Sequence, residues 1–558
     1  MWPPCSLNGT GQPHGAAPTK ANGYAPQGDM LRSEYWYRFP WLLVAAALIL
    51  VGIGLAGIYA ATDGRVDCPV ALRGLAEKQV LFLAISLAVF GLALVPSYVR
   101  IARYSYHLYG VSIALLGMLA VMRRFDLVIP DIIYPTNQAY SWIAIPRVMK
   151  FQPSELTKIA FIMALAYYLR YRKNYRTFRG LLAPFVMALV PTALVLYQPD
   201  LGTAMMFLPV LFLMLFAAGA RGKHLLAIIL MGLAMVPIFY SSMKGYQRMR
   251  IDSWLLSSCA ERLRFAMTEH REAATTNEPA AEAEGDAPTA QDSASAEETP
   301  LLPPRARKAQ AIPLTPEQEA QLVEEITSSW RFRLWRLATA ISWGKDKAEF
   351  VKARERLFAS LDIYEQWCKD GRPQTPRPPV EAPDAAPERA SFKALIQFFS
   401  SLLNDPGHQL FQAKIAVGGG GLAGRGWLAG SQTRYGFLPQ AHTDFLFPTL
   451  AEQFGFAGAM GVVLLYGILC VLGLDVSFST TEPYGKLLVV GVVGLVASQS
   501  FLNMAMSIGL MPITGIPLPF MSYGGSSLLS SFLALGLLCN VALRRLFLIA
   551  PRPFEWRE

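Results

Sequence analysis

The residues best suited to chemistry lie in one polar, glycine-rich stretch, residues 410–458, which runs into an apolar segment. Glycine backbones adopt conformations closed to other residues and come close to a ligand. Groups able to bind a phosphate or move a proton stand among these glycines: Lys414, Arg425, Arg434, His442, Thr443 and Asp444. Such chemistry beside an apolar segment indicates a substrate that is part lipid and part polar.

A second motif, FQPSELTK at residues 151–158, opens another apolar segment. Its Glu155 and Lys158 are three residues apart, which makes them neighbours on one face of a helix. Ionised groups at the end of a membrane span are costly, so we expect the two to pair and to face the protein interior.

Two further motifs interrupt apolar segments. QPDLGT at residues 198–203 places Asp200 at the tip of a tight break, where capping a helix is favoured over catalysis for this motif alone. Residues 512–527, PITGIPLPFMSYGGSS, include Ser522 and Tyr523. Irregular backbone at membrane depth is tolerated only when it is buried in protein or lines a wet cavity. We therefore expect the four motifs to share one cavity, with these polar residues as binding groups.

The composition of the 558-residue chain is that of a membrane protein. It is 53% hydrophobic and 16% charged, whereas about 25% of a soluble domain is charged. A span needs about 20 apolar residues, and ten segments are candidates: 41–61, 80–96, 108–121, 156–169, 182–196, 201–218, 225–240, 456–474, 487–507 and 526–543. The predicted fold is an all-α polytopic membrane protein with about ten transmembrane helices and a large extracytoplasmic loop carrying an inserted helical and disordered segment.

Positive charges predict the orientation. Basic residues gather at 100–103, 170–179, 221–224 and 544–545. If the chain has ten spans, all four segments lie on the same side of the membrane as the N-terminus. Cytoplasmic loops carry an excess of Lys and Arg, so both termini are expected in the cytoplasm and residues 242–455 outside it. The net charge of +10 comes largely from these loops, and no nucleic-acid partner is expected.

The domain organisation follows from the same pattern. We expect a disordered N-terminus (1–40), spans one to seven (41–251), an extracytoplasmic insert (252–400), a catalytic outer loop (401–455), spans eight to ten (456–545) and a tail (546–558).

The insert breaks the membrane pattern. Residues 268–299 are acidic and too poor in apolar groups to order themselves. A helical hairpin is expected at 315–370, capped by Thr315 with Pro316 in the first turn, followed by a proline-rich linker. The WRFRLWR sequence at 330–336 has two interpretations of equal weight: it lies on a membrane surface, or it packs within the hairpin.

The six cysteines are scattered and have no metal-ligand spacing, so free thiols are favoured. The first 40 residues are too weakly apolar for a cleavable signal peptide. No cofactor motif is evident.

Taken in order, QPSELTK, QPDLGT, LPQAHTDF and PLPFMSYGGSS resemble the SEDS family (shape, elongation, division and sporulation) of polytopic peptidoglycan glycosyltransferases. The resemblance covers nearly all of the spans and excludes the first 40 residues and the insert. GRGWLAGSQ followed by FLPQAHTDF is more similar to the elongation-type, RodA-like branch than to the division-type, FtsW-like branch.

The resemblance implies roles for particular residues. The family's catalytic aspartate lies in an Asp-Pro pair before Gln-x-Lys, and here Asp405 takes that place ahead of Gln412 and Lys414. Glu155 and Lys158 match the family's paired charges. This chain departs from the pattern in a shortened segment after Asp405, in the loss of a basic pair before Trp142 and in the long insert. On local sequence alone, Asp405 is a turn residue.

The implied activity is polymerisation of lipid II in the bacterial plasma membrane, coupled to a class B penicillin-binding transpeptidase. A carboxylate acting as general base contributes about 10²–10⁴-fold. Lys414, Arg425, Arg434 or a divalent cation would stabilise the leaving diphosphate. Two other classes stay open: a transporter of the lipid-linked precursor and a non-catalytic scaffold.

Overall fold

The computed structural model describes residues 39–66, 68–129, 140–145, 149–172, 176–243, 245–276, 316–341 and 406–544, with 357, 359, 394–396 and 398–399. Several predictions fall outside these residues. They concern Asp405, the N-terminus up to residue 38, the acidic stretch from 277, most of the second hairpin helix, the proline-rich linker and the tail.

The described chain is almost entirely helical, and eight of its helices are long and apolar enough to cross a membrane. These eight are α2 (Trp41–Ala61), α3 (Leu75–Leu94), α5 (Ser105–Arg124), α7 (Leu182–Tyr197), α8 (Leu201–Ala218), α17 (Leu446–Phe478), α18 (Pro483–Ser507) and α19 (Gly525–Arg544). Helices α6 (Pro153–Leu169) and α9 (Gly222–Ser242) occupy the other two predicted segments. The predicted polytopic helical fold is confirmed.

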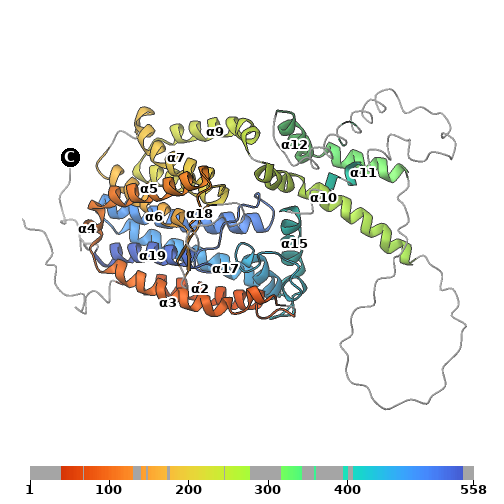
Figure 1. Ribbon diagram of the computed structural model, residues 1–558, viewed down its shortest axis with the longest axis horizontal. Helices are drawn as coiled ribbons and strands as arrows, with labels where there is room; N and C mark the ends of the chain where they lie inside the picture. Colours follow the sequence, from red (N-terminus) through yellow and green to blue (C-terminus); the bar gives the residue numbers. More distant parts are fainter. Residues whose placement is uncertain are drawn as a thin grey trace, which may run out of the picture. The chain divides into compact units, whose positions relative to one another are not determined.

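The centre of the bundle is formed by α18 and α19, whose apolar windows are 72% and 89% buried. Helix α19 packs along α3, and α18 packs against α6, α8 and α17 (Figure 1). The other spans leave more of their apolar surface exposed, as expected where lipid surrounds them.

The bundle has two chemically different ends. Helices α6, α8 and α19 each begin within a polar motif and end at a basic stretch. At that basic end the side chain of Arg544 donates to the carbonyls of Leu94 (2.9 Å) and Val95 (3.1 Å). The motifs are thus gathered at the end of the bundle opposite the basic loops.

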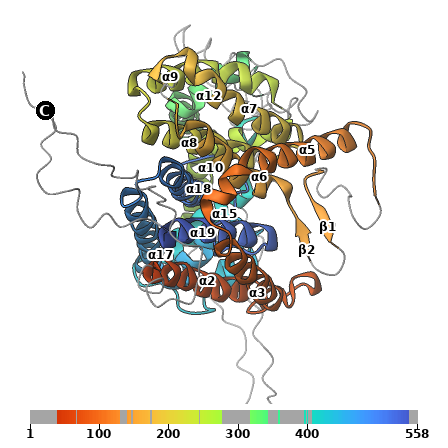
Figure 2. The ribbon, with the colours of Figure 1, turned by 90° about the vertical axis from the view of Figure 1, so that its left-hand side faces the viewer.

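Two short strands add to the predicted all-helical architecture. β1 (Ile143–Ile145) and β2 (Met149–Phe151) pair antiparallel, with Ile143 opposite Phe151, and are drawn as arrows in Figure 2. The hairpin leads directly into Gln152 and the first turn of α6. Its backbone pairing satisfies polar groups that would otherwise be exposed at the membrane edge.

The insert packs on a long helix that the sequence did not predict. Helix α10 (Gly245–Thr276) follows α9 and continues through residues 268–276, where disorder was expected. Helix α11 (Pro316–Ser328) begins at the predicted proline, and α12 (Trp330–Ile341) follows a break at Ser329.

One hydrophobic cluster joins these three helices. Its buried members, which we call the insert core, are Leu255, Leu256, Cys259, Leu263, Leu322, Val323, Ile326, Phe332, Trp335, Leu357, Leu395, Phe398 and Phe399. Because Phe332 and Trp335 are buried there, the membrane-surface interpretation of the WRFRLWR sequence is wrong for both. Helix α10 supplies the apolar face that made packing more favourable.

Candidate functional site

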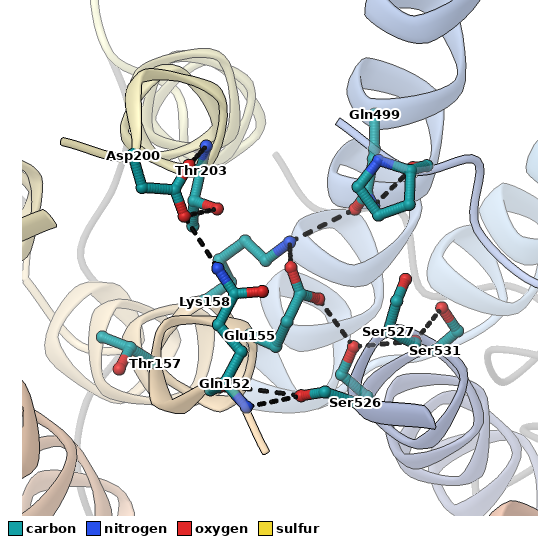
Figure 3. Close-up of polar contacts among 12 residues, drawn as sticks. Gln152, Glu155, Thr157, Lys158, Asp200, Thr203, Gln499, Ser526, Ser527 and Ser531 are labelled. Carbon is teal, nitrogen blue, oxygen red and sulfur yellow. Dashed lines mark hydrogen bonds and ion pairs between the residues drawn. The ribbon is translucent and has the colours of Figure 1, made fainter. Parts of the chain in front are cut away.

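Gln152, at the entrance to α6, ties three of the four motifs together (Figure 3). Its backbone N–H donates to Oγ of Ser526 (3.1 Å), and its Nε2 donates to Oδ2 of Asp200 (2.8 Å). The contacts bring residues 48 and 374 positions apart into one polar cluster.

The pairing of Glu155 with Lys158 is confirmed. Nζ of Lys158 lies 2.8 Å from Oε1 of Glu155, and both side chains are 4% exposed. The second carboxylate oxygen accepts from Oγ of Ser530 (2.9 Å). Lys158 also donates to Oε1 of Gln499 (3.4 Å), whose Nε2 donates to the carbonyl of Pro517 (2.9 Å; Figure 3). The ion pair therefore connects α6, α18, α19 and the Pro-rich motif.

Asp200 caps α8, as predicted for this motif. Its carboxylate accepts from the backbone N–H of Thr203 (3.0 Å) and from the Thr203 hydroxyl (2.7 Å). Burial raises the pKa of Asp200, with Glu155 acting in the same direction, while the Thr203 bonds and Lys158 lower it. The capping carboxylate is thus also one of the site's partly buried acids.

The HTDF and SYGG motifs are hydrogen-bonded to each other through backbone groups and the Ser522 hydroxyl. The N–H of Tyr523 donates to the carbonyl of His442 (2.9 Å), and Oγ of Ser522 donates to that of Thr443 (2.5 Å). Asn503 donates to the carbonyls of Asp444 (2.8 Å) and Ile516 (2.6 Å). Asn503, a buried amide on α18, was missed by sequence reasoning, although a polar residue inside a span was a usable signal.

The surroundings shift the pKa values of two groups at this contact, His442 and Asp444. Burial, assisted by the charge of Arg65, lowers the pKa of His442 to about 4, so its imidazole is neutral at physiological pH. Burial raises the pKa of Asp444 to about 6; Arg250 opposes this rise and Asp200 adds to it. An acid with a pKa near the working pH is suited to proton transfer.

The glycine-rich stretch packs on a broken helix. Helix α17 departs from helical geometry at Gly455, where φ is 67°. Beside this break, the N–H of Arg425 donates to the carbonyl of Glu452 (2.9 Å), and the N–H of Phe456 donates to that of Gly421 (2.8 Å). A Cβ on Gly424 would overlap the carbonyl oxygen of Gln453. The interpretation that these glycines admit a ligand is wrong for Gly424, which instead admits the protein's own backbone.

Glu452 holds the next part of the same stretch. Its carboxylate accepts from the backbone N–H groups of Gln432 (2.7 Å) and Thr433 (3.0 Å) and from the Thr433 hydroxyl (2.6 Å). A Cβ on Gly430 would overlap this carboxylate. Sequence reasoning missed Glu452, although an acid within an apolar segment is itself a signal.

The three basic candidates for phosphate binding have other contacts. Lys414, on α15 (Pro406–Gly419), pairs with Glu261 (Nζ–Oε1 2.8 Å). Arg425 is exposed and donates to the carbonyl of Gly419, and exposed Arg434 lies beside the Tyr435 ring. Within the described residues, none of these contacts reaches Glu155, Asp200 or Asp444.

In the part of the chain that the structure describes, no group of three or more His, Cys, Asp or Glu side chains could hold a metal ion. Cys68, Cys259, Cys470 and Cys539 are free thiols, as predicted.

Comparison with known proteins decides the family. A sequence model of the FtsW/RodA/SpoVE family, described as cell cycle proteins, matches residues 40–261 and 389–545. The chain belongs to this family. Most of the insert, residues 262–388, lies outside the matched family pattern, whereas all the membrane-spanning helices lie within it.

Relatives of the family cover most of this chain. It is 28% identical to "Peptidoglycan glycosyltransferase RodA" of Treponema pallidum (strain Nichols), over 91% of this chain and 98% of that protein. It is 27% identical to "Probable peptidoglycan glycosyltransferase FtsW" of Geobacter sulfurreducens, over 82% and 83%. A solved chain described under "Structural coordination of polymerization and crosslinking by a peptidoglycan synthase complex" superposes with a TM-score of 0.52 at 22% identity, covering 90% of this chain and 97% of that one. That likeness concerns the fold.

Proposed function

We propose that this chain is a peptidoglycan glycosyltransferase that polymerises lipid II into glycan strands. One observation carries the proposal: in a member of the FtsW/RodA/SpoVE family, four polar motifs meet at one end of the bundle around Glu155, Lys158, Asp200 and Asp444. The names of its relatives support the same activity.

The reaction needs a base and a group that stabilises a leaving diphosphate. An acceptor hydroxyl loses its proton and forms the new glycosidic bond, while the bond from the anomeric carbon to the diphosphate breaks. We propose Asp405, immediately before α15, as the base. Asp444, with its raised pKa, is the second candidate. A divalent cation would add charge stabilisation at the diphosphate.

We further propose that the motif end faces the outside of the plasma membrane, with both termini in the cytoplasm. The basic loops at the opposite end support this orientation. A cysteine introduced in the 280s, in a background lacking native thiols, should react with an impermeant thiol reagent in intact cells. Labelling only after lysis would overturn the orientation.

A transpeptidase of the class B penicillin-binding type is the proposed partner. Glycan strands without cross-links carry no load. Coupling polymerisation to cross-linking makes each new strand load-bearing. The fold neighbour described with a peptidoglycan synthase complex supports a partner of this kind. Co-purification of the full chain with such a transpeptidase tests this part.

Polymerisation of lipid II by the purified protein tests the activity itself. The Asp405→Asn variant keeps the side-chain shape and removes the base, so polymerisation should fall at least tenfold, the smaller end of general-base effects, with an unchanged Tm. Full activity in Asp405→Asn would transfer the base role to Asp444. A wild-type protein without polymerisation would favour a scaffold, or a precursor transporter if it moved lipid II across vesicle membranes.

A further inference from the structure

Helix α10 has two faces with different partners, and Figure 1 shows it running from the end of α9 toward α11 and α12. Leu255, Leu256, Cys259 and Leu263 belong to the insert core. Arg250, Ser257 and Glu261 recur at helical spacing on the opposite face. Trp254 lies on the same side by spacing and also packs against the insert core. This second face contacts α18 and α15 at the motif end of the bundle.

Three contacts hold that face in place. Nε1 of Trp254 donates to the carbonyl of Gly509 at the end of α18 (2.9 Å). Glu261 pairs with Lys414 (2.8 Å), and Oγ of Ser257 lies 3.4 Å from the same ammonium. Helix α10 is thereby fixed against both α18 and α15.

Arg250 lies one turn before Trp254 and extends to the Pro-rich motif. A Cβ placed on Gly515 would lie 3.7 Å from Nη1 of Arg250 and 3.5 Å from Oδ2 of Asp444. The two charged groups thus flank Gly515, and the charge of Arg250 acts on Asp444. Arg250 comes from α10, and Asp444 comes from the segment just before α17.

The guanidinium of Arg250 is partly buried and, among the described residues, has neither a hydrogen bond nor an ion pair. It carries five N–H donors in a fixed planar fork. A partly buried cation is stabilised when an anion pairs with it, and the fork matches the oxygens of a phosphate.

We propose that Arg250 binds the diphosphate of the lipid-linked substrate. This inference rests on the proposed polymerase function and names the basic group for its leaving group. As the bond from the anomeric carbon to the diphosphate breaks, the electron pair leaves on the diphosphate oxygen, and Arg250 stabilises that charge. Lys414, Arg425 and Arg434, expected in this role from the sequence, are bonded elsewhere or exposed.

The test measures binding of polyprenyl diphosphate and of polyprenol, its uncharged counterpart, to the purified full-length protein. Arg250→Met should weaken diphosphate binding at least tenfold, the order expected for loss of a charge-assisted hydrogen bond, and leave polyprenol binding unchanged. Arg250→Lys keeps the charge without the fork and should fall in between. Arg262→Met is the matched control on the same helix, because among the described residues the Arg262 side chain forms an exposed ion pair with Glu325.

Unchanged diphosphate binding in Arg250→Met, or an equal loss of polyprenol binding, would overturn the assignment. If Arg250→Met did not fold, the Arg250→Lys variant would provide the test. A diphosphate affinity in Arg250→Lys equal to that of the wild type would overturn the assignment. The binding measurement is independent of turnover. A wild type that fails to polymerise but binds diphosphate through Arg250 would therefore refute the polymerase proposal alone. If the wild type polymerises lipid II, and Arg250→Met has the same KM and the same diphosphate affinity, only the role of Arg250 is refuted.

Discussion

The ammonium of Lys158 lies 2.8 Å from the carboxylate of Glu155, and almost none of either side chain is exposed. One turn of α6 separates them, so the pair forms within a single helix. Glu155 also accepts from Ser530 on α19, and Lys158 also donates to Gln499 on α18. The pair is consequently both a structural joint and the charged centre of the proposed site.

Removing one charge of this pair should destabilise the protein more than removing both charges. Lys158→Met leaves a buried, uncompensated carboxylate and should lower the free energy of unfolding by about 3–5 kcal/mol. Combining Lys158→Met with Glu155→Gln removes both charges and should recover much of that loss. Thermal unfolding of the single and double variants in one detergent checks this. A double variant as unstable as the single one would contradict the buried-pair description.

Asp444 should make stability depend on pH. Burial raises its pKa to about 6 in the folded protein, whereas the carboxyl ordinarily titrates at 3.8. Folding therefore favours the protonated form, so the stabilisation is present below pH 3.8 and is lost as pH rises through about 6. Asp444→Asn should raise the Tm at pH 7.5 and lose this advantage near pH 4. Parallel Tm curves for wild type and variant across this range would exclude a raised pKa.

Glu452 should control the mobility of the glycine-rich stretch. The N–H of Gln432 donates to one carboxylate oxygen of Glu452 and that of Thr433 to the other. In Glu452→Gln one of these oxygens becomes an NH₂ group, which cannot accept, so one of the two N–H groups loses its partner. An unsatisfied buried donor costs about 1–3 kcal/mol. Hydrogen exchange in residues 421–436 should accelerate, while α17 beyond Gly455 stays protected. Asp475 is an exposed acid on α17, and Asp475→Asn serves as the control. It should leave hydrogen exchange in residues 421–436 and in α17 unchanged.

The insert core should support α10 and, through it, the site. Trp335 is fully buried, with its ring centroid 5.4 Å from that of Phe332 and 5.0 Å from that of Phe398. Trp335→Ala should destabilise the core by about 3–5 kcal/mol, speed hydrogen exchange in residues 250–263 and reduce polymerisation. Leu334→Ala, at a position 47% exposed, should have none of these three effects.

Deletion of residues 268–390 tests whether the insert holds α10 in place. Its composition predicts that the membrane bundle still folds without it. The apolar face of α10 would then lose its partners from α11 and α12, so α10 should exchange faster even if the spans remain intact. A deletion variant with unchanged protection of α10 would show that the insert core does not hold this helix.

Much of the fold was predictable because the signals are local. Ten apolar segments, the start of α11 at Pro316 and the cap that Asp200 provides depend on residues within a few positions of one another. The extent of α10 was not predictable in this way. Its residues 268–276 are polar, and the helix before them packs in a cluster that includes residues far away in sequence, such as Phe398 and Phe399.

The sequence by itself determined the membrane architecture, the Glu155–Lys158 pair and the four motifs that identify the family. Bilayer solvation and helical periodicity act through composition and short spacing, so they can be read without knowing the fold. Only the tertiary structure decided that Asn503 supports Asp444, that Gly424 admits the backbone of α17, and that Arg250 rather than Lys414 approaches the motif end. Each of these depends on which distant helix ends meet, and packing of the assembled bundle determines that.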